Sequence, residues 1–313
     1  QTMVSGPSSM FLGGNFTAIG TAARTSLGEV DLATGQPTAW APACNGQVLS
    51  LARTTDRLYV GGLYTSLGGA PHTNLGAVDI ATGLASSWTA DASDQVYALD
   101  ASGSSLLVGG NFLVLGGVNR SFVGAVDLAT GITTSWAPEA NAGPRTFVRL
   151  CDRILVGGNF TSIGGQLRNR VAALDPTSGA ALPWNPDANA TVFALHAQPG
   201  AIYLGGSMTL VGGQIRNRAA AVDPATGVLL PWNPNANGIV RALAQNGSRI
   251  LMSGSFTAVN AQPSGTVASV PNEASATCGN LAIAPGDLPV LPLGAPGSIT
   301  LTVTGGTTPI CWK

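Results

Sequence analysis

The sequence contains few charged residues. Asp, Glu, Lys and Arg together make up 9% of the 313 residues, whereas about a quarter is usual for a soluble domain. The 14 basic and 15 acidic residues nearly cancel and give a formal net charge of −1. Because no basic field exists to attract a polyanion, we expect no nucleic-acid partner.

Long hydrophobic runs are also missing. Hydrophobic residues reach 45% and the mean hydropathy is +0.28, yet no stretch approaches the ~18 consecutive apolar residues of a spanning helix. We therefore expect no membrane span. Low charge together with abundant Gly, Thr, Ser and Asn indicates an extracellular or cell-surface protein. The first residue, Gln1, suits a mature terminus left by removal of a signal peptide.

Residues that commonly carry chemistry are scarce. Neither His72 nor His196 lies beside a Ser or Cys in a recognisable nucleophile motif. The four cysteines show no CxxC or His-paired spacing. We therefore predict that the protein is not an enzyme and needs no metal or redox cofactor. Cys278 and Cys311 both lie near the C-terminus, and a disulfide between them would contribute roughly 3–4 kcal/mol.

The sequence does have a repeat of 48 residues without insertions. One column of the repeat is Asp, followed three residues later by Thr or Ser and then Gly: Asp31, Asp79, Asp127, Asp175 and Asp223. Nine residues after each Asp comes a tryptophan: Trp40, Trp88, Trp136, Trp184 and Trp232. A third column follows a Gly pair in most copies and is aromatic or Met. Periods of this length are typical of stacked supersecondary units such as propeller blades.

Each copy contains four short β-like runs, which in the fifth copy are 191–197, 201–208, 218–223 and 228–232. Six copies begin near residues 10, 58, 106, 154, 202 and 250. The sequence therefore predicts an all-β fold, a six-bladed β-propeller over residues 1–271, followed by a linker and β-rich tail over 272–313. The first copy keeps only "QTMVS" of its leading strand, and the sixth lacks the Asp-Thr-Gly turn and the Trp.

Two parts of the sequence resemble known families. The copy "VGGNFTSIGGQLRNRVAALDPTSG" resembles the delta-60 type of bacterial β-propeller repeat, which implies a secreted or surface protein. The segment "LPVLPLGAPGSITLTVTGGTTPICWK" (288–313) resembles the first half of a bacterial immunoglobulin-like domain. The resemblance implies that the native polypeptide continues past Lys313 or completes this fold elsewhere.

The Asp and Trp columns can each be interpreted as structural or as ligand-binding residues. Each Asp can accept backbone N–H groups of its own turn, and five Asp on five separate blades do not make a calcium site. The Trp motif is similar to the blade-docking motif of quinoprotein dehydrogenases, but those have a Gly-to-Trp spacing one residue shorter, usually eight blades, and adjacent cysteines. The motif therefore favours docking between blades over cofactor binding. A lectin role, with exposed indoles stacking on sugars, remains the alternative.

Two other polar patterns are candidates for contacts. The two "RNR" segments place Arg168 with Arg170 and Arg216 with Arg218, where they could bind an acidic sugar or, as is commoner, blade-edge carbonyls. Five Asn-x-Ser/Thr triplets are candidate glycosylation sites: Asn15, Asn119, Asn159, Asn189 and Asn246.

These features favour a non-enzymatic extracellular structural or adhesive protein. The segment 297–306 alternates Ile, Leu and Val with Ser and Thr, as a half-buried strand does. We expect it to pair with a neighbouring copy of the chain, which would build a surface fibre by head-to-tail contacts. The alternative is a secreted glycan-binding propeller that uses loops or Trp on one face.

Overall fold

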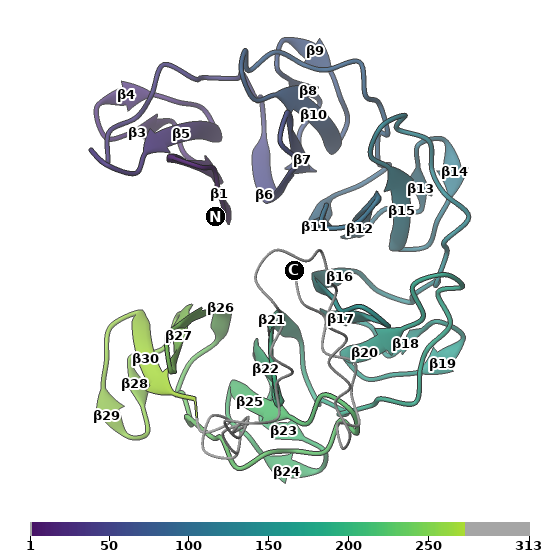
Figure 1. Ribbon diagram of the computed structural model, residues 1–313, viewed down its shortest axis with the longest axis vertical. Helices are drawn as coiled ribbons and strands as arrows, with labels where there is room; N and C mark the ends of the chain where they lie inside the picture. Colours follow the sequence, from purple (N-terminus) through teal and green to yellow (C-terminus); the bar gives the residue numbers. More distant parts are fainter. Residues whose placement is uncertain (1, 273–313) are drawn as a thin grey trace, which may run out of the picture.

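The computed structural model describes residues 2–272, and these form six similar β-sheets arranged as a ring of blades (Figure 1). The innermost strands of blades 1 to 6 are β1 (Thr2–Ser5), β6 (Gln47–Arg53), β11 (Val96–Asp100), β16 (Pro144–Arg149), β21 (Val192–Gln198) and β26 (Val240–Asn246). The middle strands are β2 (Ser9–Gly13), β7 (Arg57–Leu63), β12 (Ser105–Gly110), β17 (Ile154–Gly158), β22 (Ala201–Gly206) and β27 (Arg249–Gly254). The third strands are β5 (Leu27–Asp31), β10 (Leu75–Asp79), β15 (Val123–Asp127), β20 (Val171–Leu174), β25 (Ala219–Val222) and β30 (Val267–Pro271).

Every sheet is antiparallel in chain order, and the predicted six-bladed β-propeller is confirmed. Each blade also has an outer hairpin of two-residue strands: β3 (Ala18–Ile19) with β4 (Ala22–Ala23), β8 (Ser66–Leu67) with β9 (Ala70–Pro71), β13 (Val114–Leu115) with β14 (Val118–Asn119), β18 (Ser162–Ile163) with β19 (Gln166–Leu167), β23 (Leu210–Val211) with β24 (Gln214–Ile215), and β28 (Ala258–Val259) with β29 (Gln262–Pro263). The sequence pattern did not indicate these hairpins.

The fourth run of each repeat differs from expectation. In the fifth repeat it forms a single bridge, Val222 with Leu229, rather than a strand. Leu230 N–H still donates to the Ala221 carbonyl oxygen, and Pro231, the next residue, has no N–H to extend the ladder. The same single bridge recurs in blades 1 to 4.

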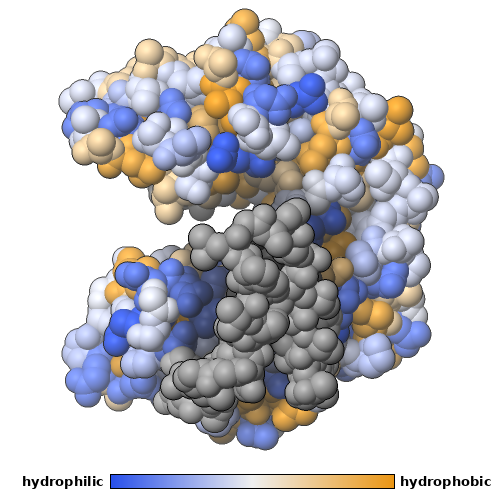
Figure 2. Space-filling model, viewed as in Figure 1, coloured by the Kyte–Doolittle hydropathy of each residue, from blue (hydrophilic) through white to orange (hydrophobic). Residues whose placement is uncertain are grey.

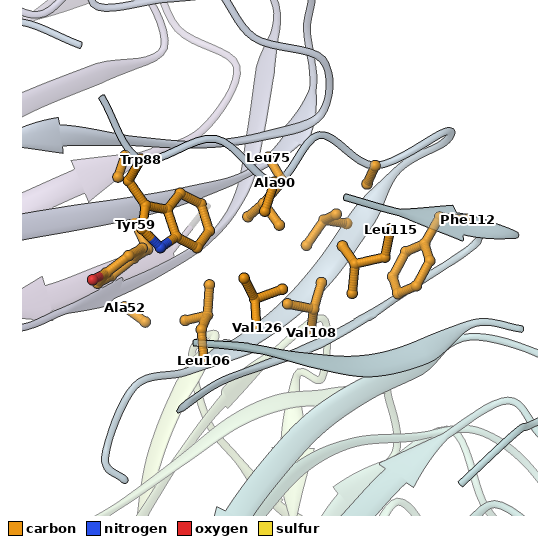
Figure 3. Packing of buried hydrophobic residues seen from close by; sticks show 13 residues of the cluster. Ala52, Tyr59, Leu75, Trp88, Ala90, Leu106, Val108, Phe112, Leu115 and Val126 are labelled. Atoms are coloured by element: carbon orange, nitrogen blue, oxygen red, sulfur yellow. The ribbon is translucent and has the colours of Figure 1, made fainter. Parts of the chain in front are cut away.

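The apolar core lies between blades. Five clusters of buried side chains fill the five junctions between consecutive blades. At the junction of blades 2 and 3, Tyr59 and Trp88 of the second repeat lie in one cluster with Val108 and Phe112 of the third (Figure 3). Strands are apolar on both faces because each sheet packs against two others.

The Gly pair of the middle strand permits this packing. A Cβ on the second glycine would meet the inner strand of its own blade, as at Gly206, where it would lie 2.2 Å from the Thr191 carbonyl oxygen. A Cβ on the first glycine would meet the next blade, as at Gly205, where it would lie 2.7 Å from Val240 Cγ1. The first glycine therefore sets the spacing between blades, and the second sets the spacing within one.

The ring is not closed by the described residues. Inner strands of consecutive blades contact one another from β1 to β26, but β26 has no comparable contact with β1. Figure 1 shows the gap between these two strands, and Figure 2 shows it as a notch in the molecular surface. We call this notch the ring gap; blades 1 and 6 flank it.

Two predictions from the sequence concern residues outside 2–272. These are the Cys278–Cys311 disulfide and the immunoglobulin-like segment 288–313. Within the described part, Cys44 is buried and free, whereas Cys151, at an exposed bend of blade 4, is disulfide-bonded. No helix in residues 2–272 is long and apolar enough to cross a membrane.

A substitution at the first glycine should act through the blade junction. Gly205→Ala should lower the free energy of unfolding by about 1–3 kcal/mol, because the added methyl overpacks the contact with Val240. Gly265→Ala is the matched control, since a Cβ there meets nothing within 4 Å. Chemical denaturation would measure both, and an equal loss in the two variants would contradict the junction role.

Candidate binding site

The Asp of each repeat holds its own turn together. Asp127 Oδ1 accepts hydrogen bonds from the backbone N–H groups of Ala129 (3.1 Å) and Thr130 (2.7 Å) and from the Thr130 hydroxyl (2.7 Å). Asp31 and Asp223 accept the same three bonds from their own turns. The Gly that follows has positive φ, which is 78° at Gly131. Local bonding thus occupies one of the two oxygens of each carboxylate.

These bonds lower the pKa of all five carboxyl groups. At Asp31, Asp79 and Asp127 the Thr hydroxyl is the largest cause, followed by the Thr backbone N–H. At Asp175 the backbone N–H of Ser178 is the largest cause of the lowered pKa. At Asp223, partial burial is the largest influence and would raise the pKa, but the bonds from Thr226 and Ala225 outweigh it.

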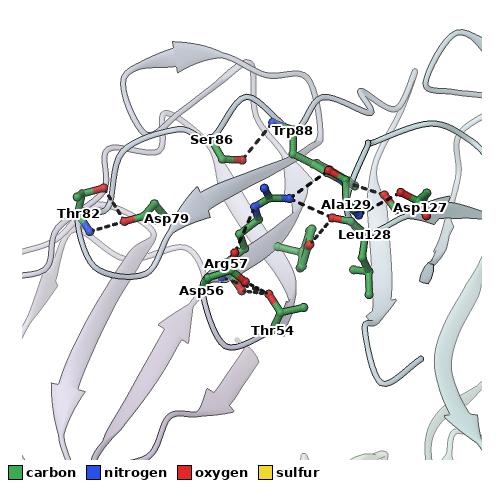
Figure 4. Close-up of polar contacts among 11 residues, drawn as sticks. Thr54, Asp56, Arg57, Asp79, Thr82, Ser86, Trp88, Asp127, Leu128 and Ala129 are labelled. Atoms are coloured by element: carbon green, nitrogen blue, oxygen red, sulfur yellow. Dashed lines mark hydrogen bonds and ion pairs between the residues drawn. The ribbon is translucent and has the colours of Figure 1, made fainter. Parts of the chain in front are cut away.

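The tryptophans lie buried between blades, with 2–9% of their surface exposed. Trp88 Nε1 donates to the Asp127 carbonyl oxygen of the next repeat at 3.0 Å (Figure 4). Trp136, Trp184 and Trp232 donate in the same way to the residue 39 positions later. Trp40 Nε1 is buried without a hydrogen-bond partner. At this exposure the indoles offer no free face on which a sugar could stack.

Two further side chains of blade 2 reach the same turn. Tyr59 Oη donates to the Leu128 carbonyl oxygen at 3.0 Å, and Arg57 Nη1 donates to the same oxygen at 3.1 Å (Figure 4). The Asp turn of blade 3 therefore has its backbone carbonyls bound by blade 2, while its Asp carboxylate binds its own amides. One turn serves both the local fold and the junction.

An asparagine column that the sequence analysis missed links the segment before a blade's inner strand to the outer hairpin of that blade. Asn189 Oδ1 accepts the backbone N–H groups of Thr209 and Leu210, and its Nδ2 donates to the Thr209 hydroxyl at 2.9 Å. Equivalent bonds occur at Asn45, Asn141 and Asn237. The 48-residue spacing of these asparagines could have indicated the role.

The predicted glycosylation sites are all exposed, but two have occupied side chains. Asn189 makes the bonds described above. Asn159 Oδ1 accepts a bond from the Thr191 hydroxyl at 3.1 Å. Asn15, Asn119 and Asn246 are also exposed.

The arginine pairs bind backbone carbonyls. Arg168 donates to the Leu182 carbonyl oxygen at 2.8 Å, and Arg216 donates to that of Leu230 at 3.1 Å. Arg170 and Arg218 donate to the carbonyl oxygens of Asn159 and Ser207. These guanidinium groups bind the chain itself.

The histidines lie apart on different blades. His72 is buried, with Nδ1 3.6 Å from Asp91 Oδ1. His196 is half-buried in β21, and burial lowers its pKa. Among residues 2–272, no three His, Cys, Asp or Glu side chains gather closely enough to hold a metal ion.

A cavity of about 750 Å³ lies in the centre of the ring and extends along the ring gap. Five inner strands carry a β-bulge whose extra residue lines or adjoins the cavity: Leu49, Tyr97, Arg145, Phe193 and Arg241. Met3, Leu12, Phe16 and Ile19 of blade 1 line the part beside the gap. This cavity is the candidate binding site.

Residues 152–179 match a family described as a β-propeller domain of unknown function, DUF5122. No curated protein matches the chain. Among solved structures, it is similar to the computationally designed Ika8 protein, with 12% identity and a TM-score of 0.56 over 86% of this chain and 70% of the other. The WD40 β-propeller domain of Doa1 gives 11% identity and a TM-score of 0.56 over 86% and 77% of the two chains. These similarities show the fold alone.

The buried indoles lead to a prediction about stability. Trp184→Ala should lower the free energy of unfolding by about 3–5 kcal/mol, because it empties a large aromatic site and removes the bond to the Asp223 carbonyl. Differential scanning calorimetry would measure the loss. An unchanged melting temperature with loss of sugar binding would instead assign the tryptophans to a lectin surface.

The five lowered Asp pKa values lead to a pH dependence. Their contribution to stability is complete above the unfolded pKa of about 3.9 and is lost as the pH falls through the lower folded values. The melting temperature should therefore fall steeply below about pH 4. Asp175→Asn, which can still accept the Ser178 N–H but does not titrate in this range, should make the fall shallower. An identical pH profile in the variant would contradict the assignment.

Proposed function

We propose that this protein is a non-enzymatic extracellular structural or adhesive protein, a subunit of a surface fibre that assembles head to tail through its C-terminal tail. The resemblance of its repeats to delta-60 propellers and of its tail to an immunoglobulin-like segment supports a surface location. The ring gap is the observation that carries the proposal, because side chains at the gap are more exposed than their equivalents at the other junctions.

Blade 1 presents an apolar face to the gap. Met3 is 67% exposed, whereas Leu51, its equivalent in blade 2, is 8% exposed. Phe16 is half-buried, whereas Phe112 and Phe160 at the same position are fully buried. These side chains belong to columns that pack against the preceding blade.

Blade 6 presents the opposite face. Val267 is 63% exposed, while its equivalent Val123 is fully buried. Leu251 is half-buried, while Leu107 at the same position is buried. Both columns pack against the following blade elsewhere in the ring.

Blade 6 also lacks two features by which the other blades pack against a following blade. Ser253 stands where the other blades have the first glycine, and at Gly205 a Cβ would approach the next blade's Val to 2.7 Å. In addition, β30 has no bridge like that of Val222 with Leu229, so its outer edge is unpaired within residues 2–272. The gap is therefore suited to a strand that adds to β30, and less suited to another full blade of this kind.

The proposed occupant is the segment 297–306 of a second copy. Its alternation places Ile299, Leu301 and Val303 on one face, which matches the apolar sides of the gap. A contact between the tail of one subunit and the gap of the next is heterologous, and it builds an open fibre when it does not close into a ring. The net charge of −1 allows subunits to pack without strong repulsion.

Removal of the tail tests the proposal. The chain lacking residues 288–313 should remain monomeric with an intact propeller, while the full chain forms ordered polymers seen by electron microscopy. Leu301→Asp should also prevent polymerisation, because it places a charge on the apolar face of the strand. Thr302→Asp, on the opposite face, is the matched control and should still polymerise.

Three outcomes would overturn the proposal. The truncated chain could still polymerise, the full chain could stay monomeric at high concentration, or Leu301→Asp and Thr302→Asp could behave alike. A monomeric full chain whose tail resists proteolysis would mean that the strand fills the gap of its own propeller.

A further inference from the structure

We infer that the central cavity contains an anion-binding site formed by Arg145 and Arg241, for an organic ligand that carries a carboxylate or phosphate group. The inference is independent of fibre assembly, because it rests on the side chains around the channel. Neither arginine was singled out by the repeat pattern.

Both arginines are the extra residues of β-bulges. The register of β16 with β17 shifts between Pro144 and Thr146, and that of β26 with β27 shifts between Val240 and Ala242. A bulged residue is released from the ladder and its side chain is redirected. Here the redirected side chains lie at the cavity, which both Arg145 and Arg241 line.

Each guanidinium group lies over an aromatic ring of the preceding blade. Arg145 Cζ is 3.6 Å from the ring centroid of Tyr97, and Arg241 Cζ is 5.3 Å from that of Phe193. Cation–π contacts of this kind restrain a guanidinium group without using its N–H donors. The bulge positions thus form a series around the channel: Tyr97, Arg145, Phe193 and Arg241.

Among residues 2–272 the two positive charges have no acidic counterpart. No Asp or Glu of this part of the chain lines the cavity, and neither arginine forms an ion pair with one of its carboxylates. Burial lowers the pKa of Arg145; Tyr97 offsets part of this effect, and the nearby charge of Arg241 adds a smaller lowering. Arg145 is half-buried and Arg241 is exposed at the cavity, and two like charges near each other favour the entry of an anion.

The apolar residues that line the rest of the cavity indicate that the anionic group belongs to an organic molecule. Leu49, Phe147 and Leu12 contribute apolar surface to the cavity, and its volume of about 750 Å³ is that of a small-molecule site. Guanidinium groups bind carboxylate and phosphate oxygens through paired N–H donors, so the two anions share one recognition chemistry. The unpaired edges of the inner strands add further backbone donors around the channel.

Calorimetric titration of the full chain tests the site with four probes. Benzoate and phenyl phosphate should bind. Benzamide, which lacks the charge, and inorganic phosphate, which lacks the phenyl ring, should bind more weakly. Arg145→Met and Arg241→Met should each weaken benzoate and phenyl phosphate binding by about tenfold or more, as expected for a lost charged hydrogen bond. Arg145→Lys, which keeps the charge but loses the planar fork, should also weaken binding.

Arg249→Met is the matched control, because Arg249 is exposed on blade 6 and does not line the cavity. It should change the affinity by no more than about twofold, because its charge lies outside the cavity and is screened by solvent. Melting curves verify that each variant is folded. The inference is overturned if neither anion binds, if benzamide binds as well as benzoate, or if Arg249→Met weakens binding as much as the cavity variants do.

Discussion

The close approach of neighbouring blades is the constraint on which the structure depends. In blades 1 to 5 the first glycine of the middle strand lets a Val or Pro of the next blade come within contact distance, and Trp88, Trp136 and Trp184 bind the Asp turn of the next blade. The two interactions are linked, because the indole can reach the next turn only when the sheets are close. The Asp carboxylate fixes the turn, and so presents the carbonyl oxygen that the indole binds.

The same constraint explains where the ring stops. Blade 6 keeps the second glycine, Gly254, whose Cβ would lie 1.9 Å from the Ile239 carbonyl oxygen, because that contact is internal to the blade. It replaces the first glycine with Ser253, because within the described chain no following blade approaches. The pattern of loss at blade 6 therefore separates the residues needed to build a blade from those needed to join two.

The 48-residue period was sufficient to predict the number of blades, since each copy carries its own strands and turns. The outer hairpins were not predicted because their strands have only two residues, as in Leu210–Val211. A strand this short cannot show an alternation of apolar and polar residues. The open ring was also not predicted, because Ser253 at the first-glycine position indicates a missing neighbour only once the contact of that glycine column with the next blade is known. At the candidate site, Arg145 and Arg241 were missed because the bulge position recurs every 48 residues but holds no common residue type: Leu49, Tyr97, Arg145, Phe193 and Arg241. The asparagine column was visible at constant spacing, yet its partner lies in the next repeat.

The ring gap changes how stability is distributed along the chain. A closed ring gives every blade two neighbours, but here blades 1 and 6 each have one, so the described domain is energetically a linear array. In such an array stability is the sum of blade terms and junction terms, and local unfolding begins at the ends. Blades 3 and 4, each flanked on both sides by complete neighbours, are then the part of the array whose opening requires the largest free energy.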